Sequence, residues 1–543
     1  DVAGSDTGDA VATAADNQSD GDAPPDPEED VLGWENGVWH NESIDVTSSD
    51  GYDRTEIERI VSRSMARVER VRGLEFDETP GVRLISVETY RQHRQRTVRE
   101  AFNTSNVSTR DRLHQNTKFE ALFLVGEDES YYGQRIADAG ASAGARYFVE
   151  DTPGLGVSAG DIAVFVPEQG GPSLDEAVLG HELGHHLQAE NFGLERFANG
   201  STEEAVNTNV SLYEGGATWV GQSYSQRCDV EWDCLPTGES APRSFTNFGL
   251  VLYGFGPYSN TATLFEQARE EGGVEAMNAL YENPPESTEQ FLHPDEYPDD
   301  EPVDVSYEDR SGDAWEMQTF EDGVDYATFG EAGVFTMLYY PSYDTRSTVA
   351  IDFNHPFDGA QGNTYVRLDF VHPASTGWDG DKLFVYTNAS SAETNETGYV
   401  WKTVWESPDE ATEFADAYTT ILREYGGAVA DRQGTYLVSD GSPFEDAFYV
   451  EVSGDTVTIV NAPTVGALAE VRQGAAPRAE TTETTTDDGE TTTDDTETAT
   501  TTATSTPGED GTDDGDGQAQ PGFGVGLAVV ALLAAVFLLR RRD

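Results

Sequence analysis

Residues 173–193 read Ser-Leu-Asp-Glu-Ala-Val-Leu-Gly-His-Glu-Leu-Gly-His-His-Leu-Gln-Ala-Glu-Asn-Phe-Gly, and this stretch decides how the chain is interpreted. Its first four residues form a capping box, which predicts that a helix begins at Leu174. Gly193 is a typical C-terminal stop for such a helix. On this helix His181 and His185 are one turn apart and share a face.

Two imidazoles at this spacing can bind one cation, and Zn²⁺ prefers nitrogen ligands at about 2.0–2.1 Å. Glu182 lies beside the pair and can reach a water bound to the metal. The His-Glu-x-x-His pattern on a predicted helix therefore indicates a zinc site. His181 and His185 would be ligands, and Glu182 would be the catalytic base.

A catalytic zinc has three protein ligands and one open position, so one ligand remains to be found. A histidine six residues after His185 would give the metzincin pattern, but that position is Asn191. His186 is rotated by about 100° on the helix and cannot join the pair. The best candidate is Glu214, on a second helix that Ser201-x-x-Glu204 should open. The three small residues that follow Glu214 let the two helices approach closely.

The rest of the body predicts an α+β fold, with a small mixed or antiparallel sheet, the metal-binding helix and a helical second half. A helical stripe of apolar residues spans 55–72, and helices dominate 173–292. Short apolar runs predict strands at 82–87, 119–125, 146–150 and 161–166.

A change of pattern near residue 330 predicts a second, smaller α+β domain. Its helix should span 408–425, because Ser407 begins a capping box and Gly426 is a stop signal. Its strands are expected at 364–371, 382–387, 399–406, 435–438, 447–452 and 456–460. The predicted organisation is a disordered segment (1–30), a metal-binding domain (31–325), an accessory domain (326–475), a disordered Thr/Asp/Glu-rich stalk (476–520) and a C-terminal signal (521–543).

The charge of the chain is extreme, because its 543 residues include 32 basic and 101 acidic side chains, a net charge of −69. Such self-repulsion destabilises a compact state at low ionic strength, whereas molar salt shortens the Debye length to about 3 Å. The composition resembles that of halophile proteins. It argues against nucleic-acid binding, which needs a basic surface.

The C-terminal end indicates an anchor. Residues 522–539 form an uncharged stretch long enough to span a bilayer, and the arginines 540–542 favour a cytoplasmic C-terminus. The order Pro521-Gly522-Phe523, apolar segment, arginines resembles the PGF-type C-terminal sorting signal of haloarchaeal surface proteins. The resemblance implies that an archaeosortase removes the helix and that the protein is lipid-anchored. A retained transmembrane helix is the alternative.

Other features fit a location outside the cell. The chain begins at Asp1 without a methionine, so we expect that a signal peptide has been removed. Cys228 and Cys234 are expected to form a local disulfide, with a free buried pair as the alternative. Sequons mark possible N-glycosylation sites at Asn41, Asn103, Asn106, Asn388 and Asn395.

The His-Glu-x-x-His pair with a distant glutamate on the next helix resembles the gluzincin pattern of thermolysin-like metallopeptidases. Residues 119–470 also resemble a little-studied prokaryotic family of HExxH/EG proteins. The segments that carry this likeness include Leu179–Gln188, Glu214-Gly-Gly-Ala217, Pro284–Pro294 with Tyr297, and Gly377-Trp-Asp-Gly-Asp381. The family's usual His-Ala after the first motif is His185-His186 here. The resemblance implies a zincin-like fold and a zinc peptidase, without a known substrate.

Under this hypothesis, Glu182 takes a proton from the metal-activated water and delivers it to the leaving amine. A further donor should stabilise the oxyanion. His293 is our candidate, with Tyr213 and Tyr224 as weaker ones. The alternative, of equal weight, is that residues 287–297 form a structural turn and that His293 has no catalytic role. The acidic run Asp299-Asp300-Glu301 indicates solvated charge first and weak calcium binding second.

Two functions are compatible with these features. The first is a cell-surface-anchored zinc metalloendopeptidase that acts on protein or peptide substrates. The second is a non-catalytic envelope protein on a peptidase scaffold, with a structural or vestigial metal site. The stalk, the sequons and the anchor fit both. The complete set of ligands and base favours the first, because a vestigial site tends to lose one of them.

Overall fold

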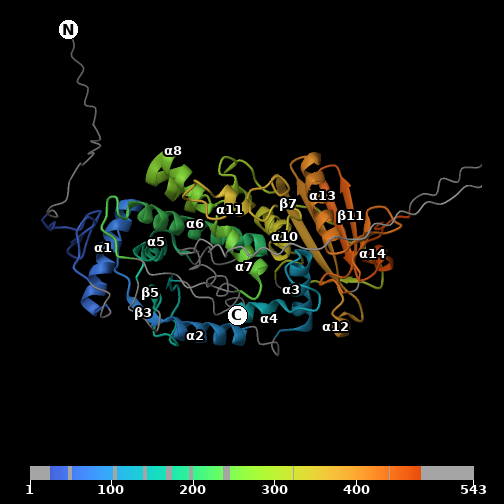
Figure 1. Ribbon diagram of the computed structural model, residues 1–543, viewed down its shortest axis with the longest axis horizontal. Helices are drawn as coiled ribbons and strands as arrows, with labels where there is room; N and C mark the ends of the chain where they lie inside the picture. Colours follow the sequence, from blue (N-terminus) through green and yellow to red (C-terminus); the bar gives the residue numbers. More distant parts are fainter. Residues whose placement is uncertain are drawn as a thin grey trace, which may run out of the picture. The chain divides into compact units, whose positions relative to one another are not determined.

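The computed structural model describes residues 25–46, 52–101, 107–138, 144–166, 174–194, 200–236, 245–321, 323–439 and 441–478. It has a mixed α and β composition (Figure 1). The chain forms two compact units. The first comprises Asp1–Ser86, Ala145–Gly193 and Ala217–Thr237, and the second comprises Val87–Gly144, Leu194–Gly216 and Gly238–Asp543. The predicted terminal segments 1–30, 476–520 and 521–543 lie mostly or wholly outside the described residues.

The first unit is built on a three-stranded sheet with the order β3-β5-β4. Strand β3 (Val82–Ser86) runs parallel to β5 (Ile162–Val166), and β4 (Ala145–Tyr147) is antiparallel to β5. Helix α5 (Glu176–Phe192) contacts β4 and α1 (Arg54–Arg72). The strands predicted at 82–87, 146–150 and 161–166 therefore form one mixed sheet beside α5, the helix that carries His181 and His185. A short hairpin, β1 (Trp34–Glu35) and β2 (Val38–Trp39), contacts α1.

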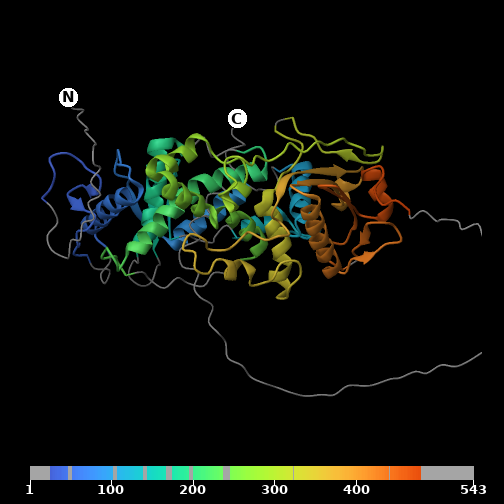
Figure 2. The ribbon, with the colours of Figure 1, turned by 90° about the horizontal axis from the view of Figure 1, so that it is seen from above.

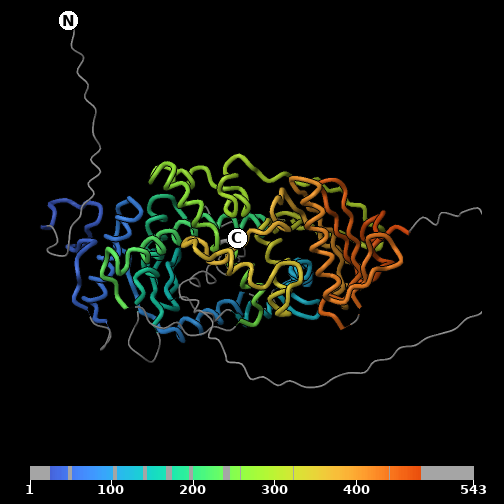
Figure 3. Tube along the Cα trace, turned by 45° about the horizontal axis from the view of Figure 1, so that its top comes forward, coloured from blue at the N-terminus to red at the C-terminus, as the bar shows by residue number. Residues whose placement is uncertain are grey.

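The second unit contains an antiparallel seven-stranded sheet with the order β6-β7-β8-β12-β11-β10-β9, whose strands lie side by side in Figure 3. The strands are β6 (Glu316–Met317), β7 (Trp378–Thr387), β8 (Gly398–Trp405), β9 (Ala428–Val429), β10 (Thr435–Leu437), β11 (Ala447–Ser453) and β12 (Thr456–Ala462). Five of the six strands predicted for this part of the chain are present.

Alternating side chains pack two helices on opposite faces of this sheet. Trp401 contacts Phe414 of α13 (Pro408–Glu424), which lies beside the strands in Figures 1 and 2. The adjacent residue Val400 belongs instead to the apolar cluster that contains Leu468 of α14 (Val465–Val471). The sheet is therefore buried on both faces at β8, while β9 and the end of β11 are exposed.

The other helices of the second unit are α2 (Val87–Ala101), α3 (Thr109–Ala121), α4 (Tyr131–Asp138), α7 (Phe248–Phe255), α8 (Thr261–Glu282), α9 (Glu289–Leu292), α10 (Gly330–Thr345), α11 (His355–Gly359) and α12 (Ser391–Thr394), with a 3-10 turn, η2 (Gly256–Tyr258). Several of them contact the sheet, as α3 and α10 do with β7. Residues 87–144 and 238–325 therefore group with the C-terminal sheet, which differs from the predicted domain boundary at residue 325.

Two predicted strands are wrong. Residues 119–125 are the end of α3 and a turn, in which the amides of Leu124 and Val125 both donate to the carbonyl of Phe119. The run is apolar because it is buried, and a short buried run does not distinguish a strand from a helix end. Residues 364–371 also form no strand. There the amides of Leu368 and Phe370 donate to side chains of the Ser259-Asn260 pair rather than to a neighbouring strand.

The capping boxes predicted at 173–176 and 201–204 are also wrong, because other residues cap the two helices. Helix α5 begins at Glu176, because the Asp175 side chain accepts the amides of Ala177 and Val178. Helix α6 (Glu203–Arg227) begins after Thr202, whose hydroxyl accepts the amide of Ala205. The C-terminal stop of α5 at Gly193 is confirmed, with φ +68°.

Candidate metal centre

Helix α5 carries the two histidines inside the protein, with every residue from Glu176 to Gln188 buried. Helix α6 crosses it closely, because glycines line the contact. A Cβ at Gly184 would lie 3.3 Å from Ala217 Cα, and a Cβ at Gly221 would lie 3.0 Å from the Ala177 carbonyl oxygen and 3.1 Å from His181 Cβ. The small residues thus bring the two helices near enough for side chains from both of them to bind one metal ion.

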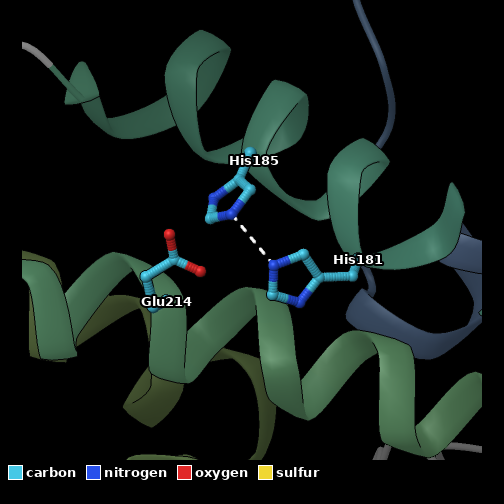
Figure 4. A group of neighbouring side chains, drawn as sticks. All are labelled: His181, His185 and Glu214. Atoms are coloured by element: carbon cyan, nitrogen blue, oxygen red, sulfur yellow. Dashed lines mark hydrogen bonds between the residues drawn. The ribbon is translucent and has the colours of Figure 1, made fainter. Parts of the chain in front are cut away.

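His181, His185 and Glu214 converge in the space beside these helices (Figure 4). One ligand atom from each residue lies within 4.8 Å of the others. The two histidines point toward each other from α5, and Glu214 points toward them from α6. The structure thus brings together the three ligands that the sequence predicts.

The geometry of the histidine pair suits a shared metal ion. The two Nε2 atoms are 3.1 Å apart. Two nitrogens bound to one tetrahedral zinc at about 2.0–2.1 Å would lie about 3.3 Å apart. The donor set consists of two imidazoles and one carboxylate, and the Nε2 atoms of the two imidazoles already face each other. This set fits Zn²⁺.

Gln188 orients one of the ligands. Its Oε1 lies 3.0 Å from His185 Nδ1. With Nδ1 as the donor of this hydrogen bond, Nε2 keeps its lone pair for the metal, which is the usual arrangement around metal-bound histidines. Gln188 follows His185 by three residues on the helix, so the sequence contained this signal, but we assigned Gln188 no role.

Glu182 is held by the backbone of an edge strand. Its Oε2 accepts the Tyr147 amide at 2.6 Å, and its side chain is 2% exposed. Strand β4, which contains Tyr147, is the last strand of its sheet among the described residues. The carboxylate therefore has a fixed position between the metal-binding helix and the sheet edge. The sequence could not show this contact, because it joins residues 35 apart.

His186 does not belong to the centre. Its Nε2 lies 3.0 Å from the carbonyl oxygen of Glu78 and 3.3 Å from the carboxylate of Glu190, and its ring stacks on Phe76. This agrees with the expected rotation of His186 away from the histidine pair.

A buried ion network fixes the start of α5. Arg63 and Arg67 of α1 donate to Glu176 Oε1 at 3.0 and 3.1 Å, and the Tyr224 hydroxyl donates to the same oxygen at 3.0 Å. The Leu235 amide donates to Oε2 at 2.6 Å. Burial and the charge of Glu176 raise the pKa of Tyr224, so its hydroxyl stays protonated. Tyr224 is thus part of the support of α5.

His293 makes its contacts elsewhere. Its Nε2 lies 3.0 Å from Glu331 Oε2. Burial lowers the pKa of His293, but the hydrogen bond and the charge of Glu331 outweigh burial and raise the pKa to about 9. The oxyanion role of His293 stays a prediction, and these contacts give it no support. Tyr213 is buried, at 3% exposure, next to Glu214 on α6.

Cys228 and Cys234 form a disulfide just after α6, with their Cα atoms 5.4 Å apart. Among the predicted glycosylation sites, Asn41 and Asn395 are exposed and Asn388 is half-buried. Asn103 and Asn106 lie outside the described residues.

The close crossing of α5 and α6 gives a testable prediction. Gly221→Ala should lower the free energy of unfolding by about 1–3 kcal/mol, because its methyl group would crowd His181 and Ala177. It should also weaken zinc retention by displacing His181. Zinc content after dialysis and thermal unfolding would measure both effects. Gln226→Ala, on the exposed side of α6, is the matched control and should change neither. Unchanged zinc retention in Gly221→Ala would show that this crossing does not position the ligand.

The comparison with known protein families gives two matches. A model described as a domain of unknown function (DUF8575) matches residues 318–472, which include the seven-stranded sheet apart from β6. A PGF-CTERM motif model matches residues 520–542. No curated protein and no solved structure matches the chain.

The PGF-CTERM motif confirms the predicted sorting signal and location. The motif marks exported proteins that are anchored at the cell surface of haloarchaea, so this protein is exported and surface-anchored. None of the helices in the described ranges is long and apolar enough to cross a membrane; the apolar segment 522–539 lies outside those ranges.

Proposed function

We propose that this protein is a zinc-dependent metallopeptidase, with a zincin-like fold, that hydrolyses peptide bonds of proteins outside the cell. The observation that carries the proposal is the convergence of His181, His185 and Glu214 with Glu182 fixed beside them. The proposed anchor is the lipid-linked form that archaeosortase processing of the PGF-CTERM signal would leave, which agrees with the location shown by the motif.

Zinc in this site would polarise a substrate carbonyl and lower the pKa of a water from 15.7 toward about 7. Glu182 would accept the proton of that water and pass it to the leaving amine. His185 is held in the ligand tautomer by Gln188.

Strand β4 supports the choice of a peptide as substrate. It lies at the edge of its sheet in the described part of the first unit, and Tyr147 directs its amide off that edge to Glu182. Sheet edges bind extended peptides through main-chain hydrogen bonds, and all three residues of β4 are themselves buried. A peptide paired along β4 would pass beside the Glu182 carboxylate, where the proton transfers take place.

The first experiment measures zinc content and casein hydrolysis of the full chain in molar KCl. We expect one zinc per chain, hydrolysis that is lost with a chelator, and recovery when zinc is added back. His185→Gln should bind no zinc and hydrolyse nothing. His186→Gln is the matched control, since it changes the adjacent buried histidine outside the ligand set.

The outcomes separate the two candidate functions. Zinc without hydrolysis of casein or of a mixture of extracellular proteins would favour the non-catalytic envelope protein with a structural metal. Zinc that remains bound in His185→Gln would contradict the ligand assignment itself.

A further inference from the structure

A second group of carboxylates converges in the second unit. Glu289 on α9 and Glu296 and Asp300 in the following turn each place an oxygen within 4.8 Å of the others. The run Asp299-Asp300-Glu301 is thereby divided: Asp299 and Glu301 are exposed, whereas Asp300 is half-buried and belongs to the group. Exposed acids are common in this chain, so the convergence alone does not define a site.

Glu289 differs from a solvated surface acid. It is 2% exposed, and among the described residues no hydrogen-bond donor contacts its carboxylate. A buried carboxylate without a donor or a counter-charge is costly. Glu289 therefore needs either a proton or a cation that the other two carboxylates share.

The neighbouring negative charges increase the need of Glu289 for a proton or a cation. Asp300 also contacts the carboxyl of Glu406, which follows β8, and burial together with Asp300 raises the pKa of Glu406 to about 7. The ion pairs of the described residues include no arginine or lysine bound to Glu289, Glu296, Asp300 or Glu406. His293, in the same segment, has its ring nitrogen Nε2 hydrogen-bonded to Glu331.

We propose that Glu289, Glu296 and Asp300 bind a divalent calcium ion, with Glu406 completing the charge around it. Calcium takes six to eight oxygen ligands at about 2.3–2.6 Å, so two of its ligands can be up to about 5.2 Å apart. Oxygens that lie within 4.8 Å of one another can therefore share one calcium ion. Magnesium demands near-ideal octahedral geometry and usually keeps several of its waters, so a group of three protein carboxylates suits calcium better.

The proposed ion would cross-link two segments distant in sequence. Glu289, Glu296 and Asp300 belong to α9 and its following turn, and Glu406 lies between β8 and the capping residue of α13. Both segments are in the second unit. Without the ion, burial and the charge of Glu331 raise the pKa of Glu289 to about 11, so its carboxyl would be protonated.

The test is calcium binding to the zinc-loaded full chain, measured by equilibrium dialysis with labelled Ca²⁺ in molar KCl and by thermal unfolding. We expect one saturable calcium per chain and a rise in unfolding temperature that magnesium at the same concentration does not match. Asp300→Asn and Glu289→Gln should each weaken this binding at least about tenfold, as loss of a charged ligand does. Asp299→Asn is the matched control and should bind calcium like the unchanged chain.

The variants keep the test decisive. Glu289→Gln preserves the shape of a buried side chain; if it does not fold, Asp300→Asn at a half-buried position carries the test alone. No saturable calcium, or equal binding by Asp299→Asn and Asp300→Asn, would overturn the proposal and assign Glu289 a proton instead. The readout is independent of hydrolysis, so this proposal and the peptidase proposal can fail separately.

Discussion

Glu182→Gln should reduce hydrolysis by about 10²–10⁴-fold while one zinc per chain remains bound. The amide keeps the size of the side chain and can still accept the Tyr147 amide through its carbonyl oxygen. It cannot accept the proton of the water. The loss should therefore appear in kcat, with zinc content and unfolding temperature unchanged. Casein hydrolysis in molar KCl, measured with the zinc content of the same preparation, checks the prediction.

Glu190→Gln is the matched control on the same helix. Glu190 accepts the amides of Asp77 and Glu78 on its two different oxygens, so glutamine keeps one of these hydrogen bonds through its carbonyl oxygen. This variant should hydrolyse at the rate of the unchanged protein. If Glu182→Gln retains activity, the base lies elsewhere, and the proposed proton path through Glu182 is wrong.

Glu176→Ala should lower the free energy of unfolding by about 3–5 kcal/mol, because removing one partner leaves buried charge without compensation. Arg63 and Arg67, each 1% exposed, would lose their shared carboxylate. The Tyr224 hydroxyl and the Leu235 amide would lose their acceptor as well. Thermal unfolding of the zinc-loaded chain at fixed salt measures the effect.

Glu58→Ala removes the partner of an exposed ion pair on α1 and serves as the control. The side chains of Arg54 and Glu58 are 92% and 60% exposed, and such pairs contribute about 0.3–0.5 kcal/mol. Equal effects of Glu176→Ala and Glu58→Ala would show that the Glu176 network does not stabilise the first unit.

The grouping of the candidate ligands was predictable from sequence because its signals are local. His181, Glu182 and His185 are set by one helical turn, and Glu214 was found as an acid on the next helix beside small residues. Some of the small residues that permit the close crossing, those that follow Glu214, could also be recognised in the sequence. What sequence could not give is the support around these residues. The Tyr147 amide and the two arginines reach α5 only through the tertiary fold.

The errors have the same origin. Glu176 matched a capping pattern, yet Asp175 caps the helix and Glu176 is turned inward to the arginines. The apolar run at 119–125 was assigned to a strand, although burial at a helix end produces the same composition. The Asp299–Glu301 run gave no sign that only its middle residue faces a buried glutamate. The local sequence pattern does not determine whether such an acidic or apolar residue is buried, or which residue it contacts.

The burial of the Glu176 network has a consequence for life in brine. A surface ion pair such as Arg54–Glu58 is screened at molar salt, where the Debye length is about 3 Å. The Arg63–Glu176–Arg67 group is buried, so dissolved ions screen it much less. The ion pairs that hold the helix with the two histidines therefore depend little on the external salt concentration. The repulsion between acidic side chains on the surface, by contrast, changes with salt.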